Sequence, residues 1–393
     1  MTSAPSPEGN LRDLLQSKSI VICCGPGGVG KTTTAAAIGL MAAVRENKKV
    51  LVVTVDPALR LSDALGVDRL GDQPSRIELS GLQGSGKGEL WASMLNTSLA
   101  WDNLVRRYAP DQATIEKILS STLYANVSRR FVQSHDYVAA ERLYELHQDG
   151  DYDLIVIDTP PSRHAIDFLD APSKMAEFFS SKLLRWILAP YRSRWVGLAS
   201  RPFTQIADRI LGGAFLAEVA EFFYLFHSMY EGFITRSTAV ENLLADPACA
   251  FVVVTTLSPG PRHEASYLIR ELGQRGFHLA AIVANKVLPS YLADPLGRAA
   301  AARLRQDHEA ISAAVAPQAG LESEILSGVL AELARNYRDY SHVALREAEE
   351  RGRLGFAKCP VLDVAHLEHD IDDVFGLAEM GEMFWPQRGS QQS

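Results

Sequence analysis

The sequence has 393 residues, of which 47% are hydrophobic and 22% are charged, and its formal net charge is −8. A chain of this length can bury a substantial core, and its acidic balance argues against nucleic acid as a partner. The N-terminus lacks the basic and apolar regions of a secretory signal, and no apolar run reaches the roughly 20 residues that a membrane-spanning helix requires. We therefore expect a soluble cytoplasmic protein, able at most to bind peripherally at the inner face of a membrane.

Short runs rich in β-branched residues recur along the chain, each followed by turn or loop residues. Their apolar side chains are continuous rather than alternating, which is typical of strands covered on both faces. Helical stretches lie between them, for instance at 32–45 and 264–275. This order predicts an α/β fold with a doubly wound, mostly parallel sheet. The predicted strands are 19–24, 50–55, 153–158, 250–256 and 279–285.

Two intervals between the predicted strands are far longer than one crossover connection requires. We interpret them as helical insertions at about 97–150 and 171–245, which form a helical subdomain within a single nucleotide-binding domain over 11–365. A C-terminal helix and tail are expected at 366–393. The first insertion and the residues just before it contain a candidate strand at 90–95 and candidate helices at 101–107, 114–123 and 137–147.

A phosphate-binding loop is predicted between the first strand and the first helix. Residues 25–32 read Gly-Pro-Gly-Gly-Val-Gly-Lys-Thr, which matches the P-loop pattern G-x-x-x-x-G-K-[ST] in the strand-to-helix context that its chemistry requires. Lys31 would bridge the β- and γ-phosphates of ATP, and the Thr32 hydroxyl would ligate Mg²⁺. The alternative is a glycine-rich turn without function. The predicted nucleotide-binding residues here are Gly27, Gly28, Val29, Gly30, Lys31, Thr32 and Thr33.

Two aspartates end strands at the same predicted edge of the sheet. Asp158 closes the run 154–158, where P-loop enzymes place a carboxylate that holds Mg²⁺, here through water. Asp56 ends the second strand, where a carboxylate can orient or deprotonate the water that attacks the γ-phosphate. Each also has a simpler interpretation, since Asp158 can cap a helix or turn and Asp56 with Pro57 can form a turn.

Asn285 follows the fifth predicted strand, at the expected place of a base-recognition loop. Its amide can both donate to and accept from a purine edge. Guanine-specific enzymes place an acid two residues after the following lysine, and this chain has Leu288 there. The sequence therefore favours adenine, and ATP or ADP as the nucleotide.

Together these residues resemble the ArsA-type family of ATPases, which includes an arsenite-pump ATPase and an ATPase that targets tail-anchored membrane proteins. The resemblance extends from about Ile20 to Val364. A Pro-Pro-Ser second switch, followed by Phe168-Leu169-Asp170, is similar to the bacterial branch. The matching motifs are Gly27 to Thr33, Asp56-Pro57-Ala58, Leu61-Ser62-Asp63-Ala64, Asp158 to His164, and Asn285.

The resemblance implies a dimeric ATPase that closes around nucleotide at its interface. It assigns catalysis to Asp56 in the first switch, magnesium binding to Asp158 in the second, and adenine contact to Asn285. It also implies that Pro360 and Val361 belong to a late loop that packs beside the base. The four cysteines form no Cys-x-x-Cys pair, so neither the zinc site nor the metalloid site of the family is expected.

Pro26 departs from the family pattern. The family usually has a lysine at this position, which reaches across the dimer to the partner's phosphates. Proline carries neither a charge nor an N–H group. Three outcomes remain open: a heterodimer with a paralogous ATPase that supplies the lysine, a local substitute such as Arg60 or Arg163, or a slow homodimeric ATPase.

The second insertion is apolar and aromatic, with a basic stretch before it. Phe222, Phe226, Met229 and Phe233 recur at helical spacing, and six Lys or Arg residues with two Trp lie between 182 and 209. Residues 182–233 therefore fit a groove for an apolar client helix or an anionic membrane surface. The alternative is that these faces pack together as the core of the subdomain.

The predicted function is a magnesium-dependent ATP hydrolase that acts as a dimeric, nucleotide-driven switch and handles hydrophobic membrane-protein clients. One alternative is the energising subunit of an anion or oxyanion transporter. A second is a positioning ATPase of the ParA/MinD kind, against which the long insertions argue.

Overall fold

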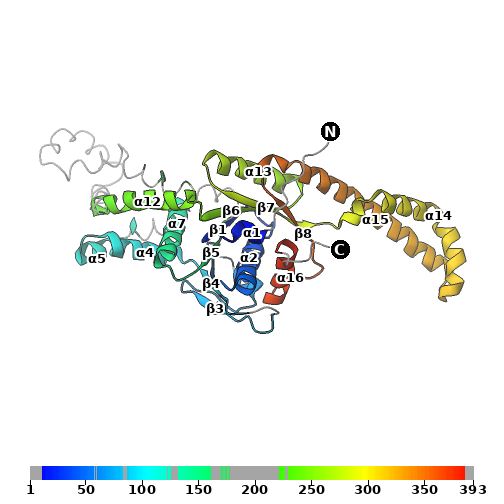
Figure 1. Cartoon of the computed structure of the whole chain (residues 1–393), viewed down its shortest axis with the longest axis horizontal. Helices are drawn as coiled ribbons and strands as arrows, with labels where there is room; N and C mark the ends of the chain where they lie inside the picture. The colour runs from blue at the N-terminus through cyan, green and yellow to red at the C-terminus, as the bar shows by residue number, and fades with distance from the viewer. Residues whose placement is uncertain are drawn as a thin grey trace, which may run out of the picture.

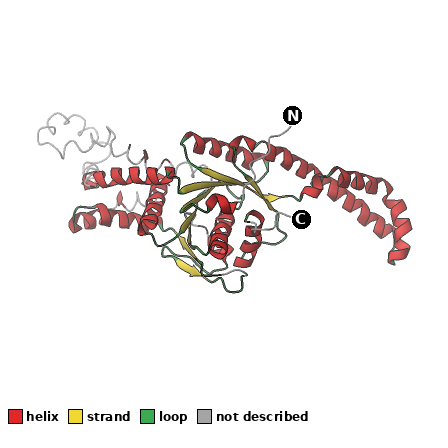
Figure 2. Ribbon diagram, in the orientation of Figure 1, coloured by secondary structure: helices red, strands yellow, loops and turns green. Residues whose placement is uncertain are grey.

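Within the part of the chain that the structure describes, eight strands form one sheet at the centre of the molecule (Figures 1 and 2). The computed structural model describes residues 11–56, 58, 60–82, 86–121, 123–124, 132–160, 170, 173–174, 177, 221–225 and 229–385. The strand order is β3-β4-β2-β5-β1-β6-β7-β8, and every pair is parallel except β3 with β4. The strands are β1 (Ile20–Cys24), β2 (Lys49–Thr54), β3 (Ser75–Ile77), β4 (Glu89–Met94), β5 (Leu154–Asp158), β6 (Cys249–Thr255), β7 (Leu279–Val287) and β8 (Val361–Ala365).

The central strands are buried on both faces, as their continuous apolar sequences predict. All residues of β1, β5 and β6 are buried. Along β1, Ile20 and Ile22 face one hydrophobic cluster while Val21 and Cys23 face the other. This alternation follows from the two-residue period of a strand. The five predicted strands and the sixth candidate are all present, so the predicted α/β class is confirmed.

Helices cover both faces of the sheet. The first face packs against α1 (Leu11–Leu15), α2 (Lys31–Glu46), α3 (Arg60–Leu65) and α16 (Val374–Phe384). The second packs against α13 (Pro259–Gln274) and against an arm of helices on the left of Figure 1. The helices of this arm are α4 (Thr97–Tyr108), α5 (Gln112–Ser120), α7 (Val132–Asp149) and α12 (Tyr230–Ala245).

A buried ion pair joins two helices of this arm. Glu141 on α7 is 1% exposed and accepts a 2.6 Å hydrogen bond from Nε of Arg236 on α12. The Tyr108 hydroxyl donates to the same carboxylate at 3.2 Å, and the Arg236 guanidinium lies 4.0 Å from the centre of the Tyr144 ring. The pair therefore links the helices before β5 to the helix before β6.

A long helical hairpin extends from the opposite end of the molecule (Figure 1). It consists of α14 (Pro295–Ala319) and α15 (Ser323–Gly352), preceded by the 3₁₀ helix η2 (Ser290–Ala293) and followed by η3 (Gly355–Ala357). Asp294 caps α14 by accepting a hydrogen bond from the Leu296 N–H, and Gly320 ends it in the left-handed conformation. Neither helix of this hairpin was predicted from the sequence.

The C-terminal part of the chain differs from the prediction in one respect. The segment expected as a loop at 360–362 begins a strand, β8, which pairs with β7 at the sheet edge. Pro360 lies just before this strand, where proline is tolerated because no ladder hydrogen bond is lost. Among the described residues, no helix is both long and apolar enough to cross a membrane.

Candidate functional site

The phosphate loop lies between β1 and α2 and depends on glycine at defined positions. Gly30 has φ of 91°, and a Cβ there would lie 2.2 Å from Nδ2 of Asn285. Only glycine fits both the backbone conformation and the space. The same Asn285 amide donates to the Val29 carbonyl at 2.8 Å, so β7 fixes the loop from the side.

Lys31 is the first residue of α2, and its side chain turns back over the phosphate loop. It is 7% exposed, and its Nζ donates to the Pro26 carbonyl at 2.9 Å. Burial lowers the pKa of Lys31, while Asp158 acts in the opposite direction. A lysine in this position can exchange the carbonyl for a phosphate oxygen, a stronger and charged acceptor.

Asp158 joins the loop to the neighbouring strand. Its Oδ2 accepts hydrogen bonds from the Thr32 hydroxyl at 2.7 Å and the Thr54 hydroxyl at 2.9 Å. The residue is 1% exposed, and burial raises the pKa of this carboxyl to about 6 even though both hydroxyls stabilise the ionised form. One carboxylate thus connects the ends of β2 and β5 to the first turn of α2.

The second oxygen of Asp158 supports a magnesium site. Oδ1 is buried and has no hydrogen-bond partner among the described residues. A buried carboxylate oxygen without a partner is costly, and water ligands of Mg²⁺ would satisfy it. The Thr32 hydroxyl and Asp158 are therefore a suitable donor set for Mg²⁺, which would neutralise charge on the phosphates of bound nucleotide.

Asp56 lies on the cavity wall, two residues beyond β2. Its N–H donates to the Thr54 hydroxyl at 3.2 Å, and its Oδ1 accepts from the Ala58 N–H at 3.0 Å. Its Oδ2 lies 3.6 Å from the Arg60 guanidinium, whose side chain is 61% exposed. The carboxylate is thus oriented by its own turn and has one cation beside it.

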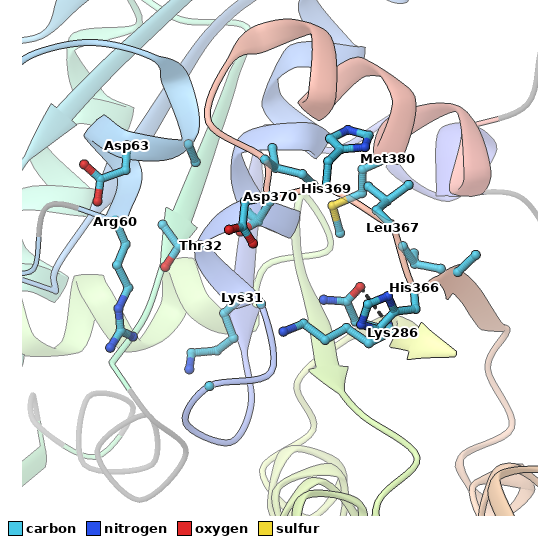
Figure 3. Close-up of a pocket in the computed structure, with 18 of the residues that line it drawn as sticks. Lys31, Thr32, Arg60, Asp63, Lys286, His366, Leu367, His369, Asp370 and Met380 are labelled. Carbon is cyan, nitrogen blue, oxygen red and sulfur yellow. Dashed lines mark hydrogen bonds between the residues drawn. The ribbon is translucent and has the colours of Figure 1, made fainter. Parts of the chain in front are cut away.

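These groups surround a cavity of about 440 Å³. Figure 3 shows Arg60 on one side of Lys31 and Lys286 on the other, with Asp370 and His369 across the opening. Three cationic side chains around one cavity suit a polyphosphate. The cavity is lined by Gly28, Gly30, Lys31, Thr32, Thr33, Asp56, Arg60, Asp63, Ala64, Thr159, Asn285, Lys286, residues 364–367, residues 369–371 and Met380.

The structure brings most of the predicted site residues together. Val29 and Asp158 lie directly behind the lining residues and are buried. Gly27, Pro360 and Val361 do not line the cavity, and Val361 packs in the core. The lining comes instead from the end of β8 and the segment after it. Pro161 to His164, including Arg163, lie outside the described residues.

The sequence singled out Arg60 and the motif that contains Asp63, and both residues line the cavity from α3. Other lining residues had no predicted role, and they include Lys286 after Asn285, the segment from His366 to Ile371, and Met380. Lys286 has φ of 60°, an unusual conformation for a residue with a side chain. This positive φ follows from the fold and leaves no signal in the sequence. The late segment has no motif, and only its place after an edge strand brings it to the cavity.

The cysteines behave as small apolar side chains. Cys23, Cys24 and Cys249 are buried in β1 and β6, and Cys359 is partly buried. Burial raises the pKa of Cys24 and Cys249 to about 12 and that of Cys359 to about 11. Metal and metalloid binding by cysteine requires the thiolate, which these environments disfavour.

Comparison with known proteins agrees with a site that binds ATP. The model of the ArsA family, described as anion-transporting ATPases, matches residues 18–312. An ATPase ASNA1 homolog of Entamoeba dispar is 24% identical over 291 residues, which is 72% of this chain and 81% of that protein. The ATPase GET3 of Malassezia globosa is 27% identical over 282 residues, covering 71% and 76%. An uncharacterized protein of Streptomyces coelicolor, SCO2128, is 28% identical over 289 residues, covering 71% and 66%. The chain therefore belongs to the ArsA family of anion-transporting ATPases and is an ATP hydrolase.

Proposed function

We propose that this ATPase acts as a dimeric switch, in which bound ATP and Mg²⁺ hold one state and hydrolysis releases it, and that the switch handles hydrophobic membrane-protein segments. The observation that carries the proposal is the position of two strand-end carboxylates. Asp158 on β5 contacts the loop threonine, and Asp56 after β2 faces the same cavity. Asp56 is followed by α3 and Asp158 by Thr159, both on the cavity wall, so a change at the phosphates can reach both segments.

Each residue has a separate role in this proposal. Lys31 and the loop N–H groups bind the β- and γ-phosphates, and Thr32 with Asp158 hold Mg²⁺. Asp56 positions the attacking water and accepts its proton. Asn285 contacts the adenine, for which one N–H of its amide is free beyond the bond to Val29. Residues 364–367 take the place beside the base that the sequence suggested for Pro360 and Val361.

Pro26 raises the question of which cation completes the site. In the free chain its carbonyl holds Lys31, and its side chain supplies no charge to a partner. One solution is a heterodimer with a paralogous ATPase whose lysine enters this site. The other is Arg60, which lines the cavity and is exposed enough to move toward the phosphates.

Turnover measurements separate these solutions. The chain is assayed alone, with each candidate paralogue, and as Arg60→Gln, with Arg76→Gln as a matched control because Arg76 is exposed on β3 and does not line the cavity. A rate that rises only on mixing supports the heterodimer. An ATP turnover rate that is as high for the chain alone as for the mixtures, and that falls in Arg60→Gln, supports Arg60 as the local substitute. If the chain alone is as fast as any mixture, the heterodimer proposal fails.

The client proposal rests on the family and on residues 182–233. In the described part of this segment, Phe222 and Met229 are 4% and 1% exposed and belong to the core. These two side chains therefore pack internally, as the simpler interpretation holds. The basic stretch 182–209 lies outside the described residues. It remains the segment that we propose for an apolar client helix or an anionic membrane surface.

Deletion of residues 186–196 tests this proposal. The variant should keep ATP binding, because the described residues that line the cavity, the phosphate loop among them, all lie in other segments. It should lose binding to an apolar helical peptide and to anionic vesicles. Retention of both would refute the assignment of the segment.

An anion-transporting role is the second candidate, favoured by the description of the matching family. Here the ATPase would supply energy to a separate membrane permease. The raised pKa values of the cysteines argue against recognition through thiolates. ATP turnover measured with and without arsenite distinguishes the roles, since stimulation by arsenite would support transport of that species.

A further inference from the structure

A row of exposed apolar side chains runs along one side of α15 in the helical hairpin. It consists of Ile325, Val329, Leu333, Tyr340 and Val343, each between 47% and 59% exposed. Because a helix turns by about 100° per residue, this spacing places all five side chains on one side of the helix. At about 1.5 Å per residue, the row is about 27 Å long. We call these five residues the apolar row.

The described part of the chain leaves the apolar row uncovered. Ala334 and Ser341, which are buried, lie on another side of α15 and face α14. Figure 1 shows the hairpin extending beyond the sheet and the helices that cover it. More than half of the large apolar side chains that are exposed in the described chain lie between Tyr291 and Val343. Such a concentration marks an interaction surface, whereas single exposed apolar residues are ordinary.

The order of residues in the apolar row suits a second copy of the same chain as its partner. An antiparallel pair of α15 helices, with a two-fold axis near Leu333, places Ile325 opposite Val343 of the second copy. It also places Val329 beside Tyr340 of the second copy and brings the two Leu333 side chains together. Each apolar side chain thus meets another, which is the self-complementarity that a two-fold interface requires.

Charged residues beside the apolar row favour the same pairing. In this antiparallel register Glu332 lies close to Arg335 of the second copy, and Glu322 lies opposite Arg346 of the second copy. By symmetry each pair forms twice. All four residues are exposed, and none has an ion pair with a residue that the structure describes. A parallel pairing in register would instead place each charge against its own copy, which is unfavourable.

A membrane surface fits the apolar row less well. The outer half of the hairpin contains no Lys or Arg between Arg305 and Arg335. The same interval contains five acidic residues, which are Asp307, Glu309, Glu322, Glu324 and Glu332. Surfaces that bind anionic lipids carry the opposite charge. The charges therefore favour a protein partner over a bilayer.

We propose that the apolar row binds the same row of a second copy in antiparallel orientation and joins two chains whether or not nucleotide is bound. None of its residues lines the nucleotide cavity. The row exposes on the order of several hundred Å² of apolar surface, approaching the roughly 800 Å² that each partner buries in a stable interface. The contact depends on the proposed function only for its role, which is to keep two ATPases of the switch together after hydrolysis.

Analytical ultracentrifugation of the full-length chain without nucleotide tests the contact. We expect a monomer–dimer equilibrium with a dissociation constant of about 1–10 µM. Val329→Glu with Tyr340→Glu should weaken the dimer at least about 100-fold, since the new carboxylates would be desolvated between apolar side chains. The matched control is Tyr267→Glu with Phe375→Glu, which replaces exposed apolar residues of α13 and α16 and should leave the dimer intact.

Two outcomes of this experiment would overturn the proposal. One is a wild-type chain that remains monomeric at concentrations well above the expected dissociation constant. The other is equal dissociation in both double variants. Circular dichroism of both variants should match that of the wild-type chain, because all four substituted side chains are about half exposed.

Charge-reversed chains test the antiparallel register. Glu332→Arg places an arginine against Arg335 of the second copy, and Arg335→Glu places two carboxylates together. Each variant alone should therefore associate about tenfold more weakly than the wild-type chain. Mixing the two variants restores opposite charges at both places and should restore the affinity. Mixing would not repair a role of either residue within its own helix, so absence of recovery would refute this register.

Failure of the contact can be distinguished from failure of the proposed function. A chain that is monomeric without nucleotide but dimerises with ATP would refute the contact and leave the switch standing. A dimer without nucleotide, together with wild-type turnover in Asp56→Asn, would refute the switch and leave the contact standing. Flotation with anionic vesicles by a monomeric chain, lost in Val329→Glu with Tyr340→Glu, would assign the apolar row to a membrane and overturn the proposal.

Discussion

Replacement of Gly30 by alanine tests how the phosphate loop is held. The alanine would have to adopt a φ of 91°, and its Cβ would approach Nδ2 of Asn285 to 2.2 Å. The backbone conformation costs roughly 1–2 kcal/mol for a residue with a Cβ. Asn285 would have to move and lose its hydrogen bond to the Val29 carbonyl, which contributes about 1 kcal/mol.

The combined cost of Gly30→Ala is therefore about 2–3 kcal/mol. If the free loop distorts to avoid the clash, the cost appears as weaker ATP binding, by a factor of about 30 to 150. If the loop stays in place, the same cost appears as a lower free energy of unfolding. Urea denaturation measures the loss in the free energy of unfolding, and titration calorimetry measures the loss in the free energy of ATP binding. The two losses should add up to the combined cost.

Gly28→Ala is the matched control. Gly28 has φ of 75°, but a Cβ there meets nothing within 4 Å, so only the backbone cost of roughly 1–2 kcal/mol applies. Asn285→Ala removes the clashing amide and should therefore cost less in the Gly30→Ala background than in the wild-type chain. Equal effects of the two glycine substitutions, or strict additivity in the double variant, would refute the reasoning.

Further predictions concern Asp158 and the helical arm. The pKa of the Asp158 carboxyl is about 3.8 in the unfolded chain and about 6 in the folded chain. The free energy of unfolding, measured without Mg²⁺ and nucleotide, should therefore fall as pH rises from about 4 to about 6. Above that pH it should remain lower by on the order of 3 kcal/mol. Asp158→Asn should remove this pH dependence in urea unfolding while abolishing magnesium-dependent turnover; an unchanged pH profile would contradict the assignment. Arg236→Met leaves the Glu141 carboxylate buried without its cation and should destabilise the arm by about 3 kcal/mol. Amide hydrogen exchange should then become faster in α7 and α12 but not in α2. Unchanged exchange rates in α7 and α12, or an equal rise in α2, would contradict the prediction.

The central sheet and the phosphate loop could be predicted from the sequence because each has a strong local signal. Strands β1, β2, β5, β6 and β7 are continuous apolar runs, and their bounds differ from the predicted ones by at most two residues. The loop is recognisable because its glycines adopt positive φ values, which residues with a side chain rarely adopt. Asp56 and Asp158 could be placed since the ends of parallel strands meet at one edge.

The remainder depends on contacts between distant segments. The hairpin α14–α15 packs mainly on itself, so its sequence shows helical composition without indicating that it leaves the core. The cavity wall from His366 to Ile371 has no motif and is brought to the loop by the pairing of β8 with β7. Asn285 was expected to face the base, and its hydrogen bond to Val29 depends on the neighbouring loop rather than on its own sequence.

The most direct test of the switch proposal is ATP hydrolysis by Asp56→Asn, measured together with ATP affinity. The substitution keeps the size of the side chain and the hydrogen bond that Oδ1 accepts from the Ala58 N–H, so binding should be retained. Turnover should fall by at least about 100-fold, because the acceptor for the proton of the attacking water is lost. Lys31→Ala is the comparison variant and should weaken both binding and turnover. Wild-type turnover in Asp56→Asn, or a loss explained entirely by weaker ATP binding, would contradict the account.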